Sequence, residues 1–317
     1  MANPVFETYG TKGIRENLSD IIYNISPTDT PFISNVGKGS TKSTYTEWQV
    51  DDLAAAADTP VAEGATAPAA VSATTTRVGN YTQIASKTVS VSGSNEAADA
   101  AGRASQMAYQ LAKKGMELKR DMEKTLVGTD KAQVAGAAGG TARELGSVTS
   151  WIGTNCSVGA TTGAVPTGDG TDIATSGDAR PLTDTLLNGV IEDIWQAGGN
   201  PSMIMCGAFQ KSKITGFEGN TNTARKFTDA ESKKFINAVD VYVSDYGELN
   251  VVPNRLMLTD TLLVLQPDMW SVDTYRDFQT KDLAVTGDFE SKQLLVEYTL
   301  TSKNEAASGA IRDLTTA

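Results

Sequence analysis

The stretch from Ser94 to Val127, SNEAADAAGRASQMAYQLAKKGMELKRDMEKTLV, carries the clearest helical period in this 317-residue chain. Small and apolar residues recur in it at steps of three and four, the pattern of one buried helix face. They are Ala97, Ala101, Ala104, Ala108, Leu111, Gly115, Leu118, Met122 and Leu126. Ser94 is a suitable N-cap, Gly128 is a suitable stop, and no proline interrupts the stretch. We therefore expect one helix over residues 94–127, about 50 Å long at ~1.5 Å per residue.

The buried face of this helix changes character along its length. Its first half offers alanines, which let a sheet approach closely, and its second half offers leucine and methionine, which fill a thicker core. We expect the strands predicted at 261–266 and 292–300 to lie on this face, and Leu118 to be essential for folding. The opposite face carries Lys113 and Lys114, with Glu117, Asp121 and Glu123 interleaved, and is predicted to be a solvated or intersubunit surface.

The segments before the helix cannot bury their own apolar sides. Residues 1–36 read as an arm, with a short helix within 14–25 and an extended run over 30–37. Residues 42–51 and 81–93 alternate like strands and are predicted to pair as a hairpin. The Ala/Thr/Pro/Gly-rich loop between them, 53–76, is uncommonly long for a compact domain. Because an isolated hairpin is marginal in water, something outside the subunit should hold it.

The segments after the helix predict a mixed α+β region. We expect helices at 183–199, capped by Thr183, and at 208–217. The strands are predicted at 151–156, 203–207, 239–244, 249–254, 261–266 and 292–300. The run 261–266 is continuously apolar and should be central in its sheet. A polar loop is expected over 218–235 and a short tail over 304–314.

The composition argues against most enzymatic chemistry. The chain has no histidine, which removes Ser-His and Cys-His catalysis and histidine zinc sites together. Its net charge is −11, with no basic cluster dense enough for sequence-specific nucleic-acid binding. Cys156 and Cys206 have no CxxC spacing and are expected to be unpaired thiols. NVGKGST (35–41) fails the phosphate-loop pattern, and TGDGTD (167–172) lacks the closing glutamate of a calcium loop, so no cofactor or metal is expected.

Several running motifs carry a resemblance across nearly the whole chain. They include NYTQIASKTVSVSG (80–93), AGRASQMAYQLAKKGMELKRDME (101–123), WQAGGNP (195–201), DVYVSDYG (240–247), VVPNR (251–255), FQTKDLAVTGD (278–288) and EYTLTSKNEAASG (297–309). In these motifs, and in its order of arm, long hairpin, long helix and late return strand, the chain resembles the major capsid proteins of tailed bacteriophages with the Hong Kong 97-type fold.

The resemblance implies a division of the chain. It implies an N-terminal arm (1–36), an extended loop (37–92), a spine helix with peripheral domain (93–183), an axial domain (184–260), and return strands with a C-terminal tail (261–317). The function implied is a non-catalytic subunit that self-assembles through hexamers and pentamers into an icosahedral head around double-stranded DNA.

The resemblance also implies partners. These are other copies of the chain, a portal, a separate scaffolding protein, and in some relatives a decoration protein, with no membrane and no sequence-specific DNA contact. The N-terminus lacks secretory features, so we expect synthesis and assembly in the host cytoplasm and residence in the virion. Charged or aromatic residues on the loop, the helix and the axial segment are the expected intersubunit contacts: Trp48, Asp51, Asp52, Glu63, Arg77, Lys113, Lys114, Arg225 and Lys226.

Two other function classes stay open at this point. One is a surface-layer or adhesin-like β-rich module, which the Thr/Ala/Gly-rich segments would suit and the long helix does not. The other is an enzyme with Asp/Glu chemistry. It would need a carboxylate pair in apolar surroundings, and pairs such as Asp51-Asp52 have none in the sequence.

Overall fold

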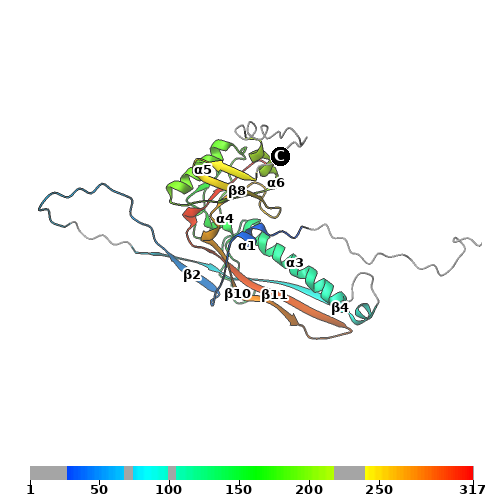
Figure 1. The fold of residues 1–317 in the computed structure, drawn as a ribbon. Helices are drawn as coiled ribbons and strands as arrows, with labels where there is room; N and C mark the ends of the chain where they lie inside the picture. Colours follow the sequence, from blue (N-terminus) through cyan, green and yellow to red (C-terminus); the bar gives the residue numbers. More distant parts are fainter. Residues whose placement is uncertain (1–26, 68–73, 99–104, 218–239, 317) are drawn as a thin grey trace, which may run out of the picture.

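A computed structural model describes residues 27–67, 74–98, 105–217 and 240–316. Its strands form three sheets. A four-stranded sheet has the order β1-β10-β11-β4, with β1 Gly37–Ser40, β10 Trp270–Asp282, β11 Phe289–Ser302 and β4 Gln83–Ser92. A two-stranded ribbon pairs β2 (Tyr45–Val50) with β3 (Thr76–Tyr81). Figure 1 shows the helix α3 lying along the four-stranded sheet, while the chain beyond the ribbon extends away from the body.

The six-stranded sheet forms the second half of the molecule. Its order is β5-β12-β9-β6-β8-β7, with β5 Cys156–Ser157, β12 Gly309–Ile311, β9 Leu262–Leu265, β6 Met203–Cys206, β8 Gly247–Pro253 and β7 Val241–Ser244. The helices α5 (Asp184–Gln196) and α6 (Ala208–Thr215) pack with it (Figure 1). Shorter elements are α1 Pro31–Asn35, α2 Gly93–Ala97, α4 Val148–Trp151, and the 3-10 turns Pro267–Met269 and Glu305–Ala307.

The long helix is real but shorter than predicted. α3 spans Gln106–Val127, and Ser105, not Ser94, is its N-cap: the Ser105 hydroxyl accepts from the Ala108 N–H at 3.2 Å. Ser94 lies inside the separate short helix α2, which ends as Ala98 turns extended. The acidic Glu96 still serves a helix N-terminus, because its carboxylate accepts from the Gln106 and Met107 N–H groups of α3. The periodic pattern therefore covers two helices, and Ala101 and Ala104 lie outside the described residues.

The core confirms which faces of α3 and β11 meet. Leu118, Met122 and Leu126 are at most 4% exposed. They share one apolar cluster with alternate residues of β11, namely Leu294, Val296, Tyr298 and Leu300, as their spacing predicts. Ala108, by contrast, is exposed. The stripe therefore packs through its large residues at the C-terminal end of the helix.

The strand predicted over 261–266 has a different partner from the one expected. β9 lies inside the six-stranded sheet, between β12 and β6, and is not paired with the sheet that carries α3. Its alternate residues enter two cores: Leu263 and Leu265 face the α3 cluster, and Leu262 and Val264 face the α5 cluster. A strand covered on both faces must be apolar at every position, which explains the unbroken run and confirms its central place.

Three further expectations are wrong. The run 81–93 does not return along 42–51: β2 pairs with β3, whereas β4 pairs with β11. The segment predicted as extended at 30–37 contains α1, because Pro31 sits at the first helical position, where its missing N–H costs nothing. The expected strand 151–156 instead ends α4 and reaches a sheet only at Cys156, because no apolar alternation continues past Ile152.

The C-terminal segment is also more than a tail. β12 pairs with β9 and β5, and Gly309, Ala310 and Ile311 are buried. Its small residues let the strand lie against α5, since a Cβ on Gly309 would meet the Val190 side chain at 2.6 Å. The predicted helix within 14–25 and polar loop 218–235 fall outside the described residues. The helices at 183–199 and 208–217 and the strands at 203–207, 239–244, 249–254 and 292–300 are confirmed to within a few residues.

Candidate assembly interface

The ribbon β2–β3 is fixed at its base to the body of the subunit. The Trp48 ring lies against that of Trp151, with centroids 5.2 Å apart. Asn80, fully buried, donates to the Leu300 carbonyl at 2.8 Å and accepts from the Gly146 N–H at 2.9 Å. These contacts set the direction in which the ribbon leaves the body.

The loop beyond the ribbon makes no comparable contacts. Its described part, residues 51–67, has no helix or strand and is exposed at every position. Leu53 is 99% exposed and Val61 63% exposed. The described part of the loop contains one hydrogen-bonded turn, in which the Ala65 N–H donates to the Ala62 carbonyl at 3.0 Å. Gly64 in this turn has a φ of +81°. The described part of this loop is therefore open to contact with another molecule along its whole length.

The predicted contact residues of the ribbon divide into two groups. Asp51, Asp52 and Glu63 are exposed, Asp51 and Asp52 at the ribbon end and Glu63 in the turn. Trp48 and Arg77 have partners in their own chain, because Trp48 packs on Trp151 and Arg77 donates twice to the Glu47 carboxylate. None of these five is shown to meet another subunit.

The predicted contact residues outside the ribbon and loop are Lys113, Lys114, Arg225 and Lys226. Lys113 is exposed on α3, while the Lys114 ammonium lies 2.7 Å from the Glu117 carboxylate on the next turn of the same helix. Arg225 and Lys226 lie outside the described residues. The intersubunit role of all four residues therefore stays a prediction.

Glu123 was expected on the charged surface of α3 and is instead fully buried. Its carboxylate accepts from the Phe32 N–H at 2.7 Å, the Ile33 N–H at 3.0 Å and the Asn254 amide at 2.7 Å. Burial raises the pKa of this carboxyl above its usual value, against the lowering effect of the three donors. Glu123 thus joins α3 to α1 at the N-terminal side and to the end of β8.

A second buried carboxylate, Glu297, holds the outer face of the four-stranded sheet. It contacts the Arg143 guanidinium, the Arg276 Nε at 2.7 Å and the Thr82 hydroxyl at 2.7 Å. Irregular register on both sides of Arg276 turns this side chain toward Glu297. The cluster is not evident from the sequence, because the basic partners of Glu297 are 154 and 21 residues away from it.

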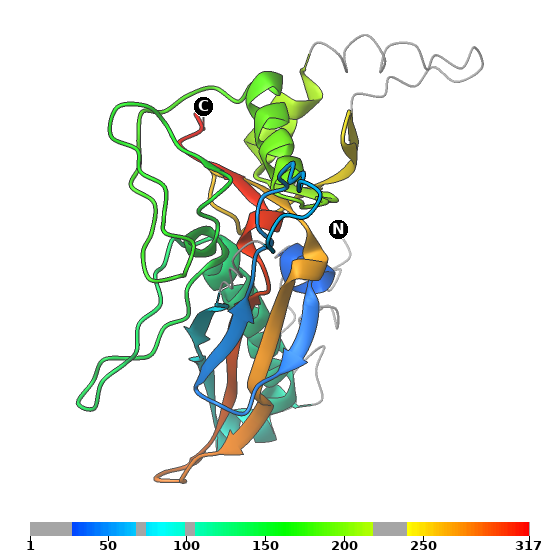
Figure 2. The ribbon, with the colours of Figure 1, turned by 90° about the vertical axis from the view of Figure 1, so that its left-hand side faces the viewer.

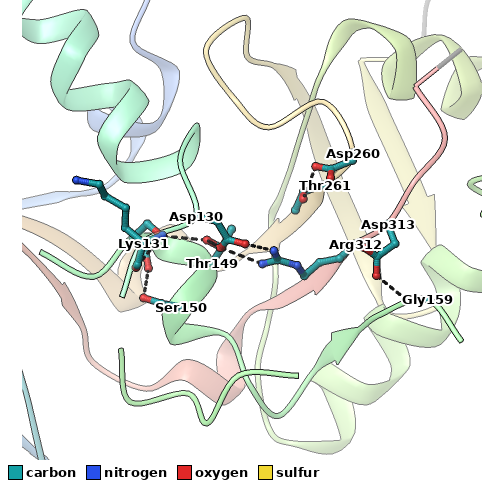
Figure 3. Close-up of polar contacts among 10 residues, drawn as sticks. Asp130, Lys131, Thr149, Ser150, Gly159, Asp260, Thr261, Arg312 and Asp313 are labelled. Atoms are coloured by element: carbon teal, nitrogen blue, oxygen red, sulfur yellow. Dashed lines mark hydrogen bonds and ion pairs between the residues drawn. The ribbon is translucent and has the colours of Figure 1, made fainter. Parts of the chain in front are cut away.

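A third polar cluster joins the two halves of the molecule. Asp130, just after α3, pairs with the Arg312 guanidinium from the C-terminal segment and accepts from the Thr149 hydroxyl at 2.5 Å (Figure 3). Next to it, the Asp313 carboxylate accepts from the Gly159 N–H at 2.8 Å, and Asp313 itself has a φ of +57°. Arg312 is only 5% exposed. These contacts tie the loop after α3 to the end of the six-stranded sheet.

The described residues show neither a candidate metal site nor an activated thiol. No group of three or more Cys, Asp or Glu residues within the described ranges could hold a metal ion. Burial raises the pKa of the Cys156 and Cys206 thiols to about 11, which makes both poor nucleophiles near neutral pH. No helix in the described ranges is long and apolar enough to cross a membrane. The exposed loop, residues 51–67, is the described segment with the least contact to its own chain, and it is the candidate contact surface.

Comparison with known proteins gives one consistent family. The family model described as SU10 major capsid protein matches residues 5–315 of the 317. The chain is 28% identical to the major capsid protein of Escherichia phage Phieco32, covering 98% of this chain and 97% of that protein.

Solved structures show the same fold at low identity. The capsid asymmetric unit of cyanophage A-1(L) has a TM-score of 0.69 at 12% identity, covering 98% of this chain and 100% of that one. A structure from Mycobacterium phage Bobi has a TM-score of 0.61 at 14% identity, covering 96% of each chain. The resemblance drawn from the sequence is thus confirmed, and the surface-layer alternative is not favoured. The chain belongs to the SU10 major capsid protein family, whose members are structural subunits of bacteriophage capsids.

Proposed function

We propose that this subunit builds an icosahedral head around double-stranded phage DNA, through hexamers and pentamers in which the extended loop of each copy lies across its neighbour. The carrying observation is the contrast at Val50 and Thr76: the chain is paired up to these residues, and residues 51–67 beyond them are exposed throughout. Ring contacts of this head-to-tail kind close into such oligomers without a symmetric patch. The acidic net charge suits a container that must not adhere to packaged DNA.

In this proposal the two halves of the molecule take the two places of a Hong Kong 97-type subunit. The four-stranded sheet with α3 is the peripheral domain, with α3 as spine helix, and the six-stranded sheet with α5 and α6 is the axial domain. This places β9 and β12 with the axial sheet, which refines the division at residues 184–260 and 261–317 expected from the sequence. The proposal keeps residues 1–36 as the N-terminal arm expected from the sequence, of which residues 1–26 lie outside the described residues.

We further propose that the protein has no catalytic role and that it assembles in the host cytoplasm. Its additional partners are a portal, a separate scaffolding protein and, on some heads, a decoration protein. Two observations support a structural role: the sequence has no dense basic cluster, and burial raises the pKa of both thiols.

The test replaces residues 51–75 with Asn-Gly. Val50 and Thr76 lie directly opposite each other, so a two-residue turn closes the ribbon without altering its base. We expect the variant to fold with unchanged circular dichroism and to form no shells in negative-stain micrographs. A control carries the conservative change Thr59→Ser in the intact loop and should assemble. Normal heads from the shortened variant would overturn the proposal.

A further inference from the structure

Three surface cavities differ in their charge. One, of about 290 Å³ where the ribbon ends, is lined by Asp51, Asp52 and Glu305. Another, of about 480 Å³ beside β7, is lined by Asp184, Glu192 and Asp245. The third, of about 430 Å³, lies between α1, α3 and β10, and we name it the α1 cavity. It is lined by Lys38 and Lys119 and one carboxylate, Asp277. An acidic ligand is therefore repelled by the first two and attracted by the third.

The α1 cavity joins an apolar floor to this cationic rim. Ile33, Met122 and Phe278 supply the apolar surface, and Phe278 is 43% exposed. The Lys119 ammonium lies 5.9 Å from the centre of the Phe278 ring. Within the described residues, neither Lys38 nor Lys119 takes part in an ion pair. The cavity thus suits an apolar side chain next to a carboxylate.

The cavity also adjoins an open sheet edge. β1 pairs with β10 only as far as Thr274, so among the described residues no strand pairs with residues 275–282 of β10 on that side (Figure 2). Asp277 and Phe278 belong both to this open edge and to the cavity lining. The chain that flanks a turn seated in the cavity can therefore add backbone hydrogen bonds along β10.

The loop turn has the matching chemistry. Residues 51–67 contain four acidic residues and no lysine or arginine. Val61 directly precedes the Ala62–Ala65 turn and is 63% exposed. It lies two residues before Glu63, which is also exposed. Figure 1 shows the loop leaving the body on the side away from α3, so it does not fold back onto the α1 cavity of its own subunit.

We propose that the turn Val61–Gly64 of one subunit docks in the α1 cavity of a second copy, with Val61 on the apolar floor and Glu63 beside Lys38 and Lys119. The inference rests on the proposed function, since it names the surface that receives the loop. It also explains why the loop carries no basic residue: a lysine near the turn would be repelled by the rim.

The first test is a disulfide between copies. In assembled particles of the double variant Glu63→Cys/Lys38→Cys, mild oxidation should give a ladder of covalent multimers on non-reducing gels. The matched control, Glu63→Cys/Asp245→Cys, moves the second thiol to the cavity beside β7 and should stay monomeric, as should the wild-type chain with its two native cysteines. An equal ladder in both variants, or none in the first, would overturn the inference.

The second test reverses charges and needs no oxidation. Lys119→Glu should raise the subunit concentration required for assembly several-fold, on the scale of roughly five-fold per lost surface pair, and Glu63→Lys should do the same. Combining the two reversals should restore assembly. Loss of shells in the Asn-Gly variant with no rescue in the double reversal would reject this docking site and leave the proposed function standing. Shells from the Asn-Gly variant would reject both.

Discussion

The α3 half of the subunit and the ribbon with its loop differ in where their partners lie. α3 buries Leu118 and Leu126 against its own sheet, so the core contacts of the helix lie within one chain. The ribbon buries only its base, through Trp48 and Asn80, and the loop beyond it exposes Leu53 and Val61. The difference indicates that the subunit folds through one region and assembles through the other, and mutations should separate the two.

The largest effect is expected from Leu118→Asp. Leu118 is 1% exposed at the centre of the main apolar cluster. Losing a buried leucine and burying an unpaired carboxylate should cost more than about 4 kcal/mol, a large part of a domain's total stability. We expect loss of the cooperative unfolding transition in circular dichroism. The control Lys114→Asp, at a surface ion pair on the same helix, should stay folded; a folded Leu118→Asp subunit would contradict the role given to α3.

An intermediate effect is expected from Trp48→Ala, which acts at the junction of the two regions. The variant loses the Trp48–Trp151 contact but leaves the α3 core intact. Since Trp48 is only half-buried, we expect a loss of about 1–2 kcal/mol in urea unfolding. Leu53→Ala, at a 99% exposed site in the loop, should change stability by less than about 0.5 kcal/mol. No loss of stability in Trp48→Ala would mean that the ribbon base contributes nothing to folding.

The smallest effect is a pH dependence from Glu123, which attaches α1 to α3. Because its folded-state pKa is raised, the folded protein binds more protons than the unfolded chain between about pH 4.3 and that raised value. The free energy of unfolding should therefore fall as pH rises through this window, and the loss should be complete above the raised pKa.

The measurement compares wild type with Glu123→Gln by urea unfolding at several pH values from 4 upward. The amide does not titrate, so the difference between the two proteins should change with pH only inside that window, by at most about 1.4 kcal/mol per unit of pKa difference. Glu117→Gln, at the surface pair with Lys114, is the control. A pH-independent difference would mean that the Glu123 pKa is not raised by folding.

The sequence alone was sufficient wherever the pattern was local and the burial one-sided. The stripe of α3 identified Leu118 and Met122 as core, because the helix period decides which side chains share a face. The long low-complexity segment 53–76 marked the loop as needing an outside partner. The running motifs identified the capsid family, which the family comparison confirms.

Only the tertiary structure decided the pairings between distant segments. β4 pairs with β11 and not with β2, and the segment expected as a tail contains the sheet strand β12. These strand partners lie 45 or more residues apart in the chain, a separation that no local period encodes. The burial of Glu123 could not be predicted for the same reason, because its partners are distant in the chain and its sequence neighbours are surface charges. It becomes a core residue only because the N–H groups of α1 and the Asn254 amide converge on it from 91 and 131 residues away.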